Sequence, residues 1–209
     1  MDAQRRAEIE QRVRALCEEA DFSAATDGTI RGYGPEILGF LVATHASEAD
    51  AGEVFSDVCL AVLRSLPQFS WQSSLRTWMY VIARNASHRL RRDTSRRVGT
   101  PGRVSVSASA LEGVAQAVRT ATLGFLRTQT RSALEKLRDS LEAEDRELLV
   151  LRIDRGLSWD DIALTFHEGS DAPSSEELAR SSQRLRKKFQ LVKEQLRAMA
   201  KKAGLASPE

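Results

Sequence analysis

The chain has few of the residues that would support a disulfide framework, a metal cluster or a membrane span. Its 209 residues include two cysteines and three histidines, and none of these has a partner at metal-ligand spacing. Proline occurs five times, and no apolar run approaches the roughly 20 residues that cross a membrane. The charged N-terminus also lacks the pattern of a signal peptide. We therefore expect a cytoplasmic protein with no metal, no cofactor and no membrane insertion.

The sequence also lacks the patterns that carry catalysis. It contains no Gly-rich phosphate-binding loop, and the adjacent Asp160 and Asp161 would point to different sides of a helix. An enzyme acting on nucleic acid is therefore the weakest of the functional alternatives, and we expect no catalytic residues.

What the sequence does contain is helical periodicity along its whole length. Apolar residues recur at steps of three and four, and valine and isoleucine never alternate over the length of a strand. This pattern predicts an all-α protein of two small helical domains. The expected helices cover residues 4–20, 35–44, 48–66, 74–92, 110–139, 144–154, 159–166 and 175–203.

Local signals mark the ends of several of these helices. Pro35 follows Gly34 and is expected in the first turn of its helix, where a missing amide hydrogen costs little. Ser174 and Glu177 have the spacing of a capping box, and Ser47 and Ser158 each precede an aspartate by three residues. The composition of residues 96–110 changes to that of a flexible tether, which predicts a domain boundary there.

Charge is distributed in alternating blocks. Residues 1–60 hold 5 basic and 12 acidic side chains, and residues 61–110 hold 9 basic and 1 acidic. Residues 111–180 then hold 9 and 14, and residues 181–209 hold 8 and 2. Each half therefore ends in a cationic block that suits a polyanion, preceded by an acidic block that suits a basic partner.

The first cationic block lies on the expected helix at residues 74–92. A helical wheel places Leu75, Trp78 and Met79 on an apolar stripe that predicts core. The opposite side suits phosphates and exposed bases, with Asn85 and Arg92 at its margin. This side carries Thr77, Tyr80, Arg84, His88 and Arg91.

The second cationic block has the pattern of a helix-turn-helix. The expected order is a helix, a turn at Gly156, a short helix capped by Ser158, and then a basic amphipathic helix at residues 175–203. The alternative that we weighed for this half is a plain amphipathic bundle with a lysine-rich exterior.

Two stretches carry a resemblance to a known family. The run SSLRTWMYVIARN and its surroundings resemble region 2 of bacterial sigma-70 family sigma factors of the extracytoplasmic-function (ECF) class. The stretch LEAEDRELLVLRIDRGLSWDDIALTF and the basic helix after it resemble their region 4. This resemblance implies region 2 at residues 1–95, a linker at 96–126 and region 4 at 127–205.

The resemblance also implies roles for individual residues. The helix that docks on RNA polymerase core corresponds to Asp50, Glu53, Phe55, Asp57 and Val58. The residues that match the family's −10 contacts are Phe69, Gln72, Ser73 and Asn85. We add the polar and basic residues on the side of the helix at 74–92 opposite its apolar stripe, which are Tyr80, Arg84, His88, Arg91 and Arg92. Contacts to the −35 element correspond to Arg180, Ser181, Gln183, Arg184, Arg186, Lys187 and Lys188.

The sequence departs from the family pattern in three places. Residues 166–173 form a longer turn than usual between the two helices of the helix-turn-helix. Ser182 is polar at a position that is usually apolar, and Gly52 and Ser56 replace larger polar residues on the docking helix. These departures affect −35 specificity and the strength of docking, for which Phe55 is expected to compensate.

The implied function is recognition and opening of promoters by RNA polymerase. The implied partners are promoter DNA, the β′ clamp helices and β flap of the polymerase core, and an anti-sigma factor as a regulator. The main alternative is a stand-alone helix-turn-helix transcriptional regulator that does not bind polymerase.

Overall fold

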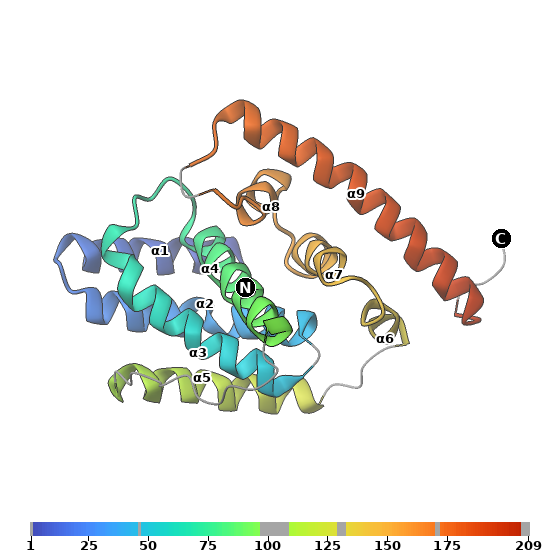
Figure 1. The fold of residues 1–209 in the computed structure, drawn as a ribbon. Helices are drawn as coiled ribbons and strands as arrows, with labels where there is room; N and C mark the ends of the chain where they lie inside the picture. The colour runs from blue at the N-terminus through green and yellow to red at the C-terminus, as the bar shows by residue number, and fades with distance from the viewer. Residues whose placement is uncertain (1, 46, 97–108, 129–132, 170–171, 206–209) are drawn as a thin grey trace. The chain divides into compact units, whose positions relative to one another are not determined.

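The computed structural model describes residues 2–45, 47–96, 109–128, 133–169 and 172–205, and within these ranges all regular elements are helical (Figure 1). The expected all-α class is confirmed. The α-helices are α1 (Ala3–Glu18), α2 (Phe22–Thr44), α3 (Glu48–Ser65), α4 (Leu75–Arg96), α5 (Ser109–Thr128), α6 (Ala133–Arg138), α7 (Ala143–Leu149), α8 (Trp159–Thr165) and α9 (Ser175–Lys202). A short 3-10 helix covers Leu66–Gln68, and a π-helical turn covers Val150–Asp154.

The chain forms two compact units. The first comprises Met1–Val42 and Ser47–Leu126, and the second comprises Ala43–Ala46 and Arg127–Glu209. Among the described residues, no helix combines the length and apolar character that crossing a membrane requires.

Helices α1 and α2 approach closely because α2 carries two glycines one turn apart. A Cβ atom added at Gly32 would lie 2.9 Å from Cγ2 of Ile9, which is closer than real Cβ contacts allow. One added at Gly28 would lie 3.5 Å from Cγ2 of Val13, in ordinary contact. Glycine at position 32 therefore sets the separation of these two helices.

The predicted start of α2 at Pro35 is wrong, because the helix begins at Phe22 and runs through the proline. A proline inside a helix removes one backbone hydrogen bond and costs about 3 kcal/mol. Buried apolar residues on both sides of the proline offset this cost, among them Ile30, Tyr33, Ile37 and Leu38.

Half of the predicted linker at 96–126 is a helix that packs within the first unit. Helix α5 buries Val114, Ala115 and Val118, and a Cβ atom at Gly34 of α2 would lie 3.1 Å from Cγ1 of Val118. In Figure 1, α5 lies along α3. The flexible composition at 97–108 lies outside the described residues, and apolar burial fixes the segment that follows it.

The second unit is held together by the apolar stripe of its longest helix. Leu185, Phe189, Val192 and Leu196 of α9 are buried, as the periodicity predicted. Their buried counterparts come from α7, the π-helical turn and α8, with Leu148, Leu149, Leu151, Leu157 and Ile162 as the largest. The turn between α7 and α8 contains Gly156, whose φ of +64° is in the left-handed region that favours glycine.

Candidate nucleic-acid interface

Helix α3 presents an acidic face. Glu53 is exposed, while Asp50 and Asp57 are half-buried. The hydroxyl of Ser47 accepts a hydrogen bond from the Asp50 amide at 3.0 Å and caps the helix, as predicted. Like charges at these spacings repel each other slightly, and a basic partner would relieve that repulsion.

Phe55 and Val58 are not part of this face, which corrects the prediction that they contact a partner. Both side chains are fully buried, and Cζ of Phe55 lies 3.3 Å from the position of a Cβ atom at Gly34. The core needs these large apolar groups to hold α3 against α2 and α5. Docking through α3 therefore cannot rely on Phe55.

Helix α5 contacts α3 beside the acidic face. Nη1 of Arg119 donates a hydrogen bond to Oγ of Ser56 at 3.0 Å, and Ser56 itself donates to the carbonyl of Gly52 at 3.1 Å. Burial raises the pKa of Cys59 to about 12, although the nearby Arg119 guanidinium lowers it in part. Cys59 is therefore a protonated core thiol at neutral pH.

The loop between α3 and α4 contains an aromatic cluster. The ring of Phe69 stacks on Trp78 with centroids 4.6 Å apart and planes inclined by 27°. Trp71 lies on Phe69 with centroids 4.8 Å apart, and the guanidinium carbon of Arg14 on α1 is 5.5 Å from the centroid of the Trp71 ring. Cation–π contacts of this kind add to the burial of the rings.

The polar residues of this loop are accessible. Gln72 is exposed and Ser73 is half-buried. The next residue, Ser74, accepts a hydrogen bond from the amide of Thr77 at 3.0 Å and so caps the start of α4. The loop therefore joins a fixed helix end to a surface with flat aromatic groups and short hydrogen-bonding groups.

Tyr80 was predicted on the cationic side of α4, and the structure corrects this. Its hydroxyl donates to Oε1 of Glu36 at 2.8 Å, and its ring packs edge-on against Phe40 at 5.4 Å. Arg76 also donates to Glu36, through Nε at 2.8 Å and through Nη2. A tyrosine hydroxyl that is hydrogen-bonded to a carboxylate can be buried completely, so Tyr80 holds α4 on α2.

The other predicted −10 contacts on α4 differ from one another in solvent exposure. Arg84 follows Tyr80 by one turn and is also buried, with 1% of its surface exposed. It therefore does not lie on the exposed cationic surface that the helical wheel predicted. Asn85 and Arg92 are exposed, and His88 and Arg91 are half-buried.

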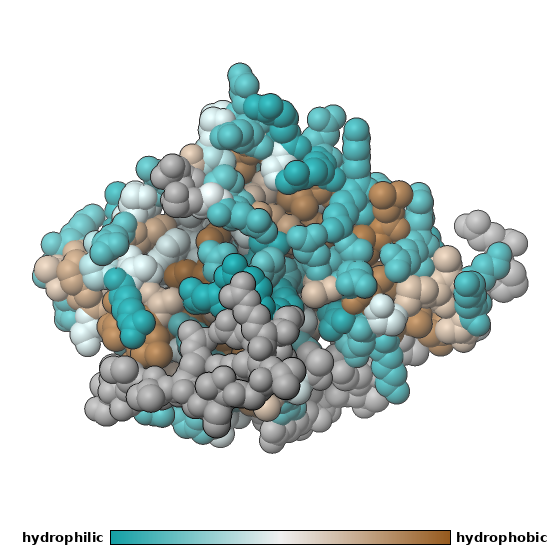
Figure 2. Space-filling model, in the orientation of Figure 1, coloured by the Kyte–Doolittle hydropathy of each residue, from teal (hydrophilic) through white to brown (hydrophobic). Residues whose placement is uncertain are grey.

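Helix α9 begins with the predicted capping box. Oγ of Ser174 accepts from the amide of Glu177 at 3.3 Å, and the Glu177 carboxylate accepts from the Ser174 amide at 2.8 Å. Hydrophilic side chains cover most of the visible surface over α9 (Figure 2). Among the predicted −35 contacts, those that are exposed are Arg180, Gln183, Arg184, Arg186 and Lys187, and Ser181 is half-buried.

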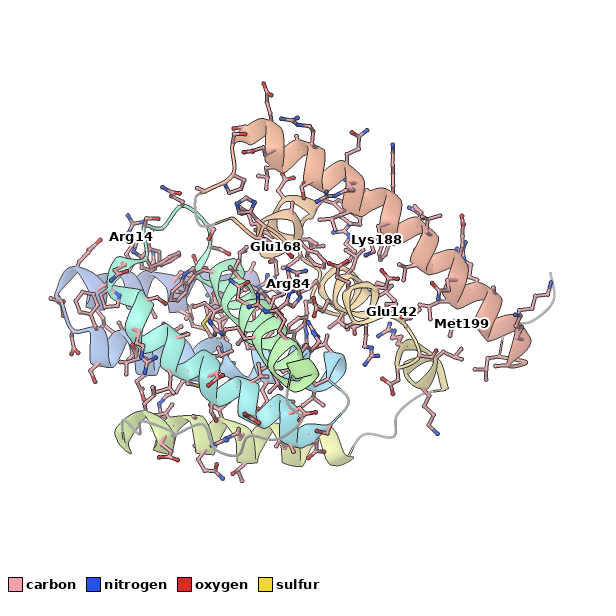
Figure 3. All side chains as sticks on the ribbon, in the orientation of Figure 1. Arg14, Arg84, Glu142, Glu168, Lys188 and Met199 are labelled. Carbon is pink, nitrogen blue, oxygen red and sulfur yellow. The ribbon has the colours of Figure 1, made fainter. Side chains whose placement is uncertain are left out.

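Lys188, also a predicted DNA contact, is half-buried and differs from these exposed cations in having acidic partners. Its Nζ lies 2.6 Å from Oε2 of Glu144 and 3.1 Å from Oδ1 of Asp145, both on α7 (Figure 3). Burial lowers the pKa of Lys188, but hydrogen bonds to the two carboxylates raise it by more. Lys188 thus ties α9 to α7.

Ser182, the polar residue at a usually apolar position, joins the two helices of the helix-turn-helix. Its hydroxyl donates at 2.7 Å to Oδ1 of Asp160 and lies 3.2 Å from the carbonyl oxygen of Trp159. The Trp159 ring also packs edge-on against Phe189 at 5.4 Å. Because Ser182 is 3% exposed and hydrogen-bonded, its polarity is satisfied inside the unit.

In the long turn before α9, the imidazole of His167 packs over Gly169. A Cβ atom at Gly169 would collide with the imidazole of His167. Residues 170–171 of this turn lie outside the described residues, so the predicted effect of its length stays a prediction.

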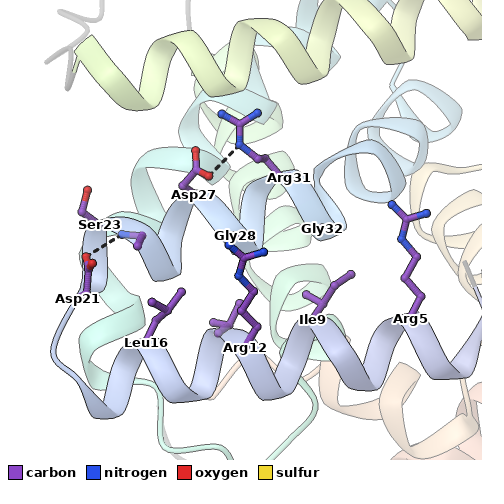
Figure 4. Close-up of a pocket in the computed structure, with 12 residues that line it drawn as sticks. Arg5, Ile9, Arg12, Leu16, Asp21, Ser23, Asp27, Gly28, Arg31 and Gly32 are labelled. Atoms are coloured by element: carbon purple, nitrogen blue, oxygen red, sulfur yellow. Dashed lines mark hydrogen bonds and ion pairs between the residues drawn. The ribbon is translucent and has the colours of Figure 1, made fainter.

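A groove lies between α1 and α2 in the first unit (Figure 4). Arg5, Arg12 and Arg31 line it, together with Asp21 and Asp27. Nε of Arg31 donates to Asp27 at 2.8 Å, and Oδ1 of Asp21 accepts from the amide of Ala24 at 3.0 Å. Asp21 thus hydrogen-bonds the first turn of α2, and Arg31 and Asp27 form a surface ion pair. We therefore assign the groove to packing of the two helices.

The part of the chain that the structure describes contains no group of three or more His, Cys, Asp or Glu side chains that could hold a metal ion. Cys17 and Cys59 are free thiols.

Sequence reasoning missed four residues that build this interface. Arg14, Trp71, Glu36 and Arg119 make the contacts described above, and none was assigned a role in advance. The aromatic composition of the FSWQSS loop was a signal for Trp71. The other three act across long sequence separations, which periodicity within one helix does not reveal.

Comparison with models of known protein families gives a match to part of the chain. The family model for Sigma-70 region 2 matches residues 29–97. The matched segment contains the acidic face of α3, the aromatic loop and α4, whereas α1 and residues 127–209 lie outside it. Searches of curated proteins and of solved structures found no significant match.

Proposed function

We propose that this protein is a sigma factor of the sigma-70 family and of the ECF class, acting in the cytoplasm. It directs the RNA polymerase core to specific promoters and opens them, and it performs no catalysis itself. Residues 1–95 act as region 2, and residues 127–205 act as region 4. Residues 96–126 connect them, with α5 packed on region 2.

The observation that carries this proposal is the content of the matched segment 29–97. An exposed acidic residue, Glu53, and an exposed loop residue, Gln72, lie in one small domain with Asn85. The acidic face suits the basic surface of a large partner, and the loop with α4 suits unpaired bases. A promoter-opening factor needs both properties in one domain.

The energetics of opening are consistent with this role. Extruding a base from a duplex costs a few kcal/mol, and stacking on an aromatic side chain returns about 1–3 kcal/mol per base. The polar residues of α4 that remain accessible, His88, Arg91 and Arg92, add phosphate contacts. The acidic face meanwhile docks on the β′ clamp helices of the polymerase.

In region 4, α9 enters the major groove of the −35 element while the unit contacts the β flap. Its exposed residues near the helix start, Arg180 and Gln183, are placed to read base edges. Lys187, farther along, holds phosphates. An anti-sigma factor is the partner that we propose for regulation.

The direct test is reconstitution with purified polymerase core. Adding the full chain should produce transcripts that start at defined promoters, and core alone should not. The absence of promoter-dependent transcripts across a genomic library, with the chain demonstrably bound to core, would contradict the proposal.

The second candidate is a stand-alone helix-turn-helix regulator, which the Ser182 link between α8 and α9 also allows. Such a protein would bind duplex DNA without polymerase. Co-elution with polymerase core separates the two candidates, because only the sigma factor needs the acidic face of α3 for this binding.

A further inference from the structure

Helix α5 is packed less deeply than the helices that it covers. Its buried side chains, Val114, Ala115 and Val118, are between 4% and 9% exposed, whereas the buried apolar residues of α2 and α3 are 0–2% exposed. Its polar contact is the 3.0 Å hydrogen bond from Arg119 to Ser56. The buried Nε of Arg119 has no hydrogen-bond partner among the described residues, and an unsatisfied group of this kind costs stability.

The apolar contact of α5 lies where α2 and α3 meet. A Cβ atom at Gly34 of α2 would lie 3.1 Å from Cγ1 of Val118 and 3.3 Å from Cζ of Phe55 on α3. Val118 therefore packs over the junction of the two helices, and α5 lies along α3 (Figure 1). The segment that matches Sigma-70 region 2 ends at residue 97, so the matched region does not include α5.

The polar contact of α5 lies at the edge of the acidic face of α3. Arg119 donates to Ser56, and its charge also acts on Cys59, one turn further along the same side of α3. We call this side, formed by Ser56 and Cys59, the Ser56 side. Glu53 lies one turn before Ser56, and Asp57 is the next residue. Helix α5 thus brings a positive charge beside the acidic face, where a basic partner would place its own.

We propose that α5 is a removable cover on the Ser56 side of α3, which competes with polymerase core for this helix. The proposal rests on the proposed function, because it requires that core docks on the acidic face of α3. A large partner lying along this face meets α5 at its edge, so tight docking requires that α5 leaves. The apparent affinity for core is then reduced in proportion to the fraction of chains in which α5 is displaced.

The experiment displaces α5 without changing α3. Gln116 is exposed on α5 and donates to Thr120 of the same helix at 3.5 Å. Gln116→Pro should break the helix, whereas the matched control Gln116→Ala should keep it. Arg119→Ala is a milder variant that removes only the hydrogen bond to Ser56. Circular dichroism and thermal unfolding check that each full-length variant is folded.

Cys59 reports whether α5 is displaced. Its side chain is 2% exposed, and burial raises its pKa to about 12, so the covered thiol should react slowly with a chromogenic disulfide reagent. In chains that also carry Cys17→Ser, Cys59 is the only thiol. We expect faster labelling of Cys59 in Gln116→Pro than in Gln116→Ala. Equal labelling rates would show that α5 does not cover the Ser56 side and would overturn the proposal.

Binding to purified polymerase core tests the competition. We expect Gln116→Pro to bind core about 5-fold or more tightly than wild type, Arg119→Ala to gain less, and Gln116→Ala to bind as wild type. If the proline unfolds the first unit, Arg119→Ala is used for both measurements. Faster labelling of Cys59 combined with equal or weaker core binding would overturn the cover role.

The outcomes also separate this inference from the proposed function. Loss of the cover role in a chain whose wild type still binds core leaves the proposed function in place. No core binding by the wild type or by any of the variants overturns the proposed function and this inference with it.

Discussion

At the scale of single residues, Glu36 determines how α4 lies on α2. Its carboxylate accepts hydrogen bonds from both Arg76 and the Tyr80 hydroxyl. The side chains of Arg76 and Glu36 are only 11% and 14% exposed. Burial lowers the pKa of Arg76, but the hydrogen bond and charge of Glu36 raise it by more, so Arg76 stays charged.

Removing this carboxylate should destabilise the first unit strongly. In Glu36→Ala, a mostly buried guanidinium loses its charge partner, and such changes cost about 3–5 kcal/mol. Denaturant unfolding followed by circular dichroism measures this loss. Asp27→Ala is the matched control, because it breaks the exposed pair of Asp27 with Arg31 and should change stability little. Equal effects of the two substitutions would refute the central role of Glu36.

Two adjacent lysines of α9 should behave differently. Lys187 is exposed, whereas Lys188 pairs with Glu144 and Asp145. Lys187→Ala should weaken DNA binding equally for all sequences and reduce the slope of log affinity against log salt by about 1. Lys188→Ala should leave this slope unchanged and lower the stability of the second unit. A reduced salt slope for Lys188→Ala would show that its pairing with α7 is broken on DNA.

At the scale of elements, the helix caps were predicted correctly, whereas the start of α2 and the buried side of α4 were not. The caps at Ser47, Ser158 and Ser174 are all formed, because a capping hydrogen bond spans three residues and needs no tertiary contact. The helical wheel assigned Tyr80 to the exposed side of α4. A polar side chain on that side can nevertheless be buried when a residue distant in the sequence, here Glu36, accepts its hydrogen bond. The sequence therefore predicted the helical class and the helix caps, but not the start of α2 or the contacts between helices.

The start of α9 gives an element-scale prediction about pH. Hydrogen bonds from the backbone and side chain of Ser174 lower the pKa of Glu177 below its ordinary 4.5. A lowered pKa in the folded state means that the stabilisation is present above pH 4.5 and is lost as pH falls through the folded value. Ser174→Ala should return the pKa of Glu177 towards 4.5, as measured by carboxyl NMR titration. A titration that does not move would show that the capping box does not persist in solution.

At the scale of the whole molecule, the alternating charge blocks become surfaces of separate units. The acidic block of residues 1–60 supplies the face of α3, and the basic block of residues 181–209 lies mostly on α9. The apolar stripes decide which side of each helix is left to carry charge. The sequence did not predict that α5 packs within the first unit. The composition of residues 96–110 indicated a flexible tether, whereas the apolar periodicity from residue 110 indicated a helix, and these two signals conflict.

Charge reversal on α3 tests whether its acidic face is the docking surface that we propose for the polymerase core. Glu53→Lys changes an exposed side chain, so we expect the fold to persist and binding to polymerase core to weaken by about tenfold or more. Glu8→Lys makes the same charge change on an exposed residue of α1 and should bind nearly as wild type. Gel filtration with core polymerase at several salt concentrations measures both variants. Equal binding of Glu53→Lys and wild type would exclude the α3 face from docking.

The distribution of the three tryptophans gives each unit its own optical reporter. Trp71 and Trp78 belong to the aromatic cluster of the first unit. Trp159 is the first residue of α8, where its ring packs against Phe189 of α9 and has the guanidinium carbon of Arg152 4.9 Å from its centroid. Replacing Trp71 and Trp78 by phenylalanine would leave one fluorophore, whose emission reports on the second unit alone. Replacing Trp159 instead would leave the emission of the first unit. Time-resolved fluorescence of these two proteins could then establish which unit responds first when promoter DNA is added.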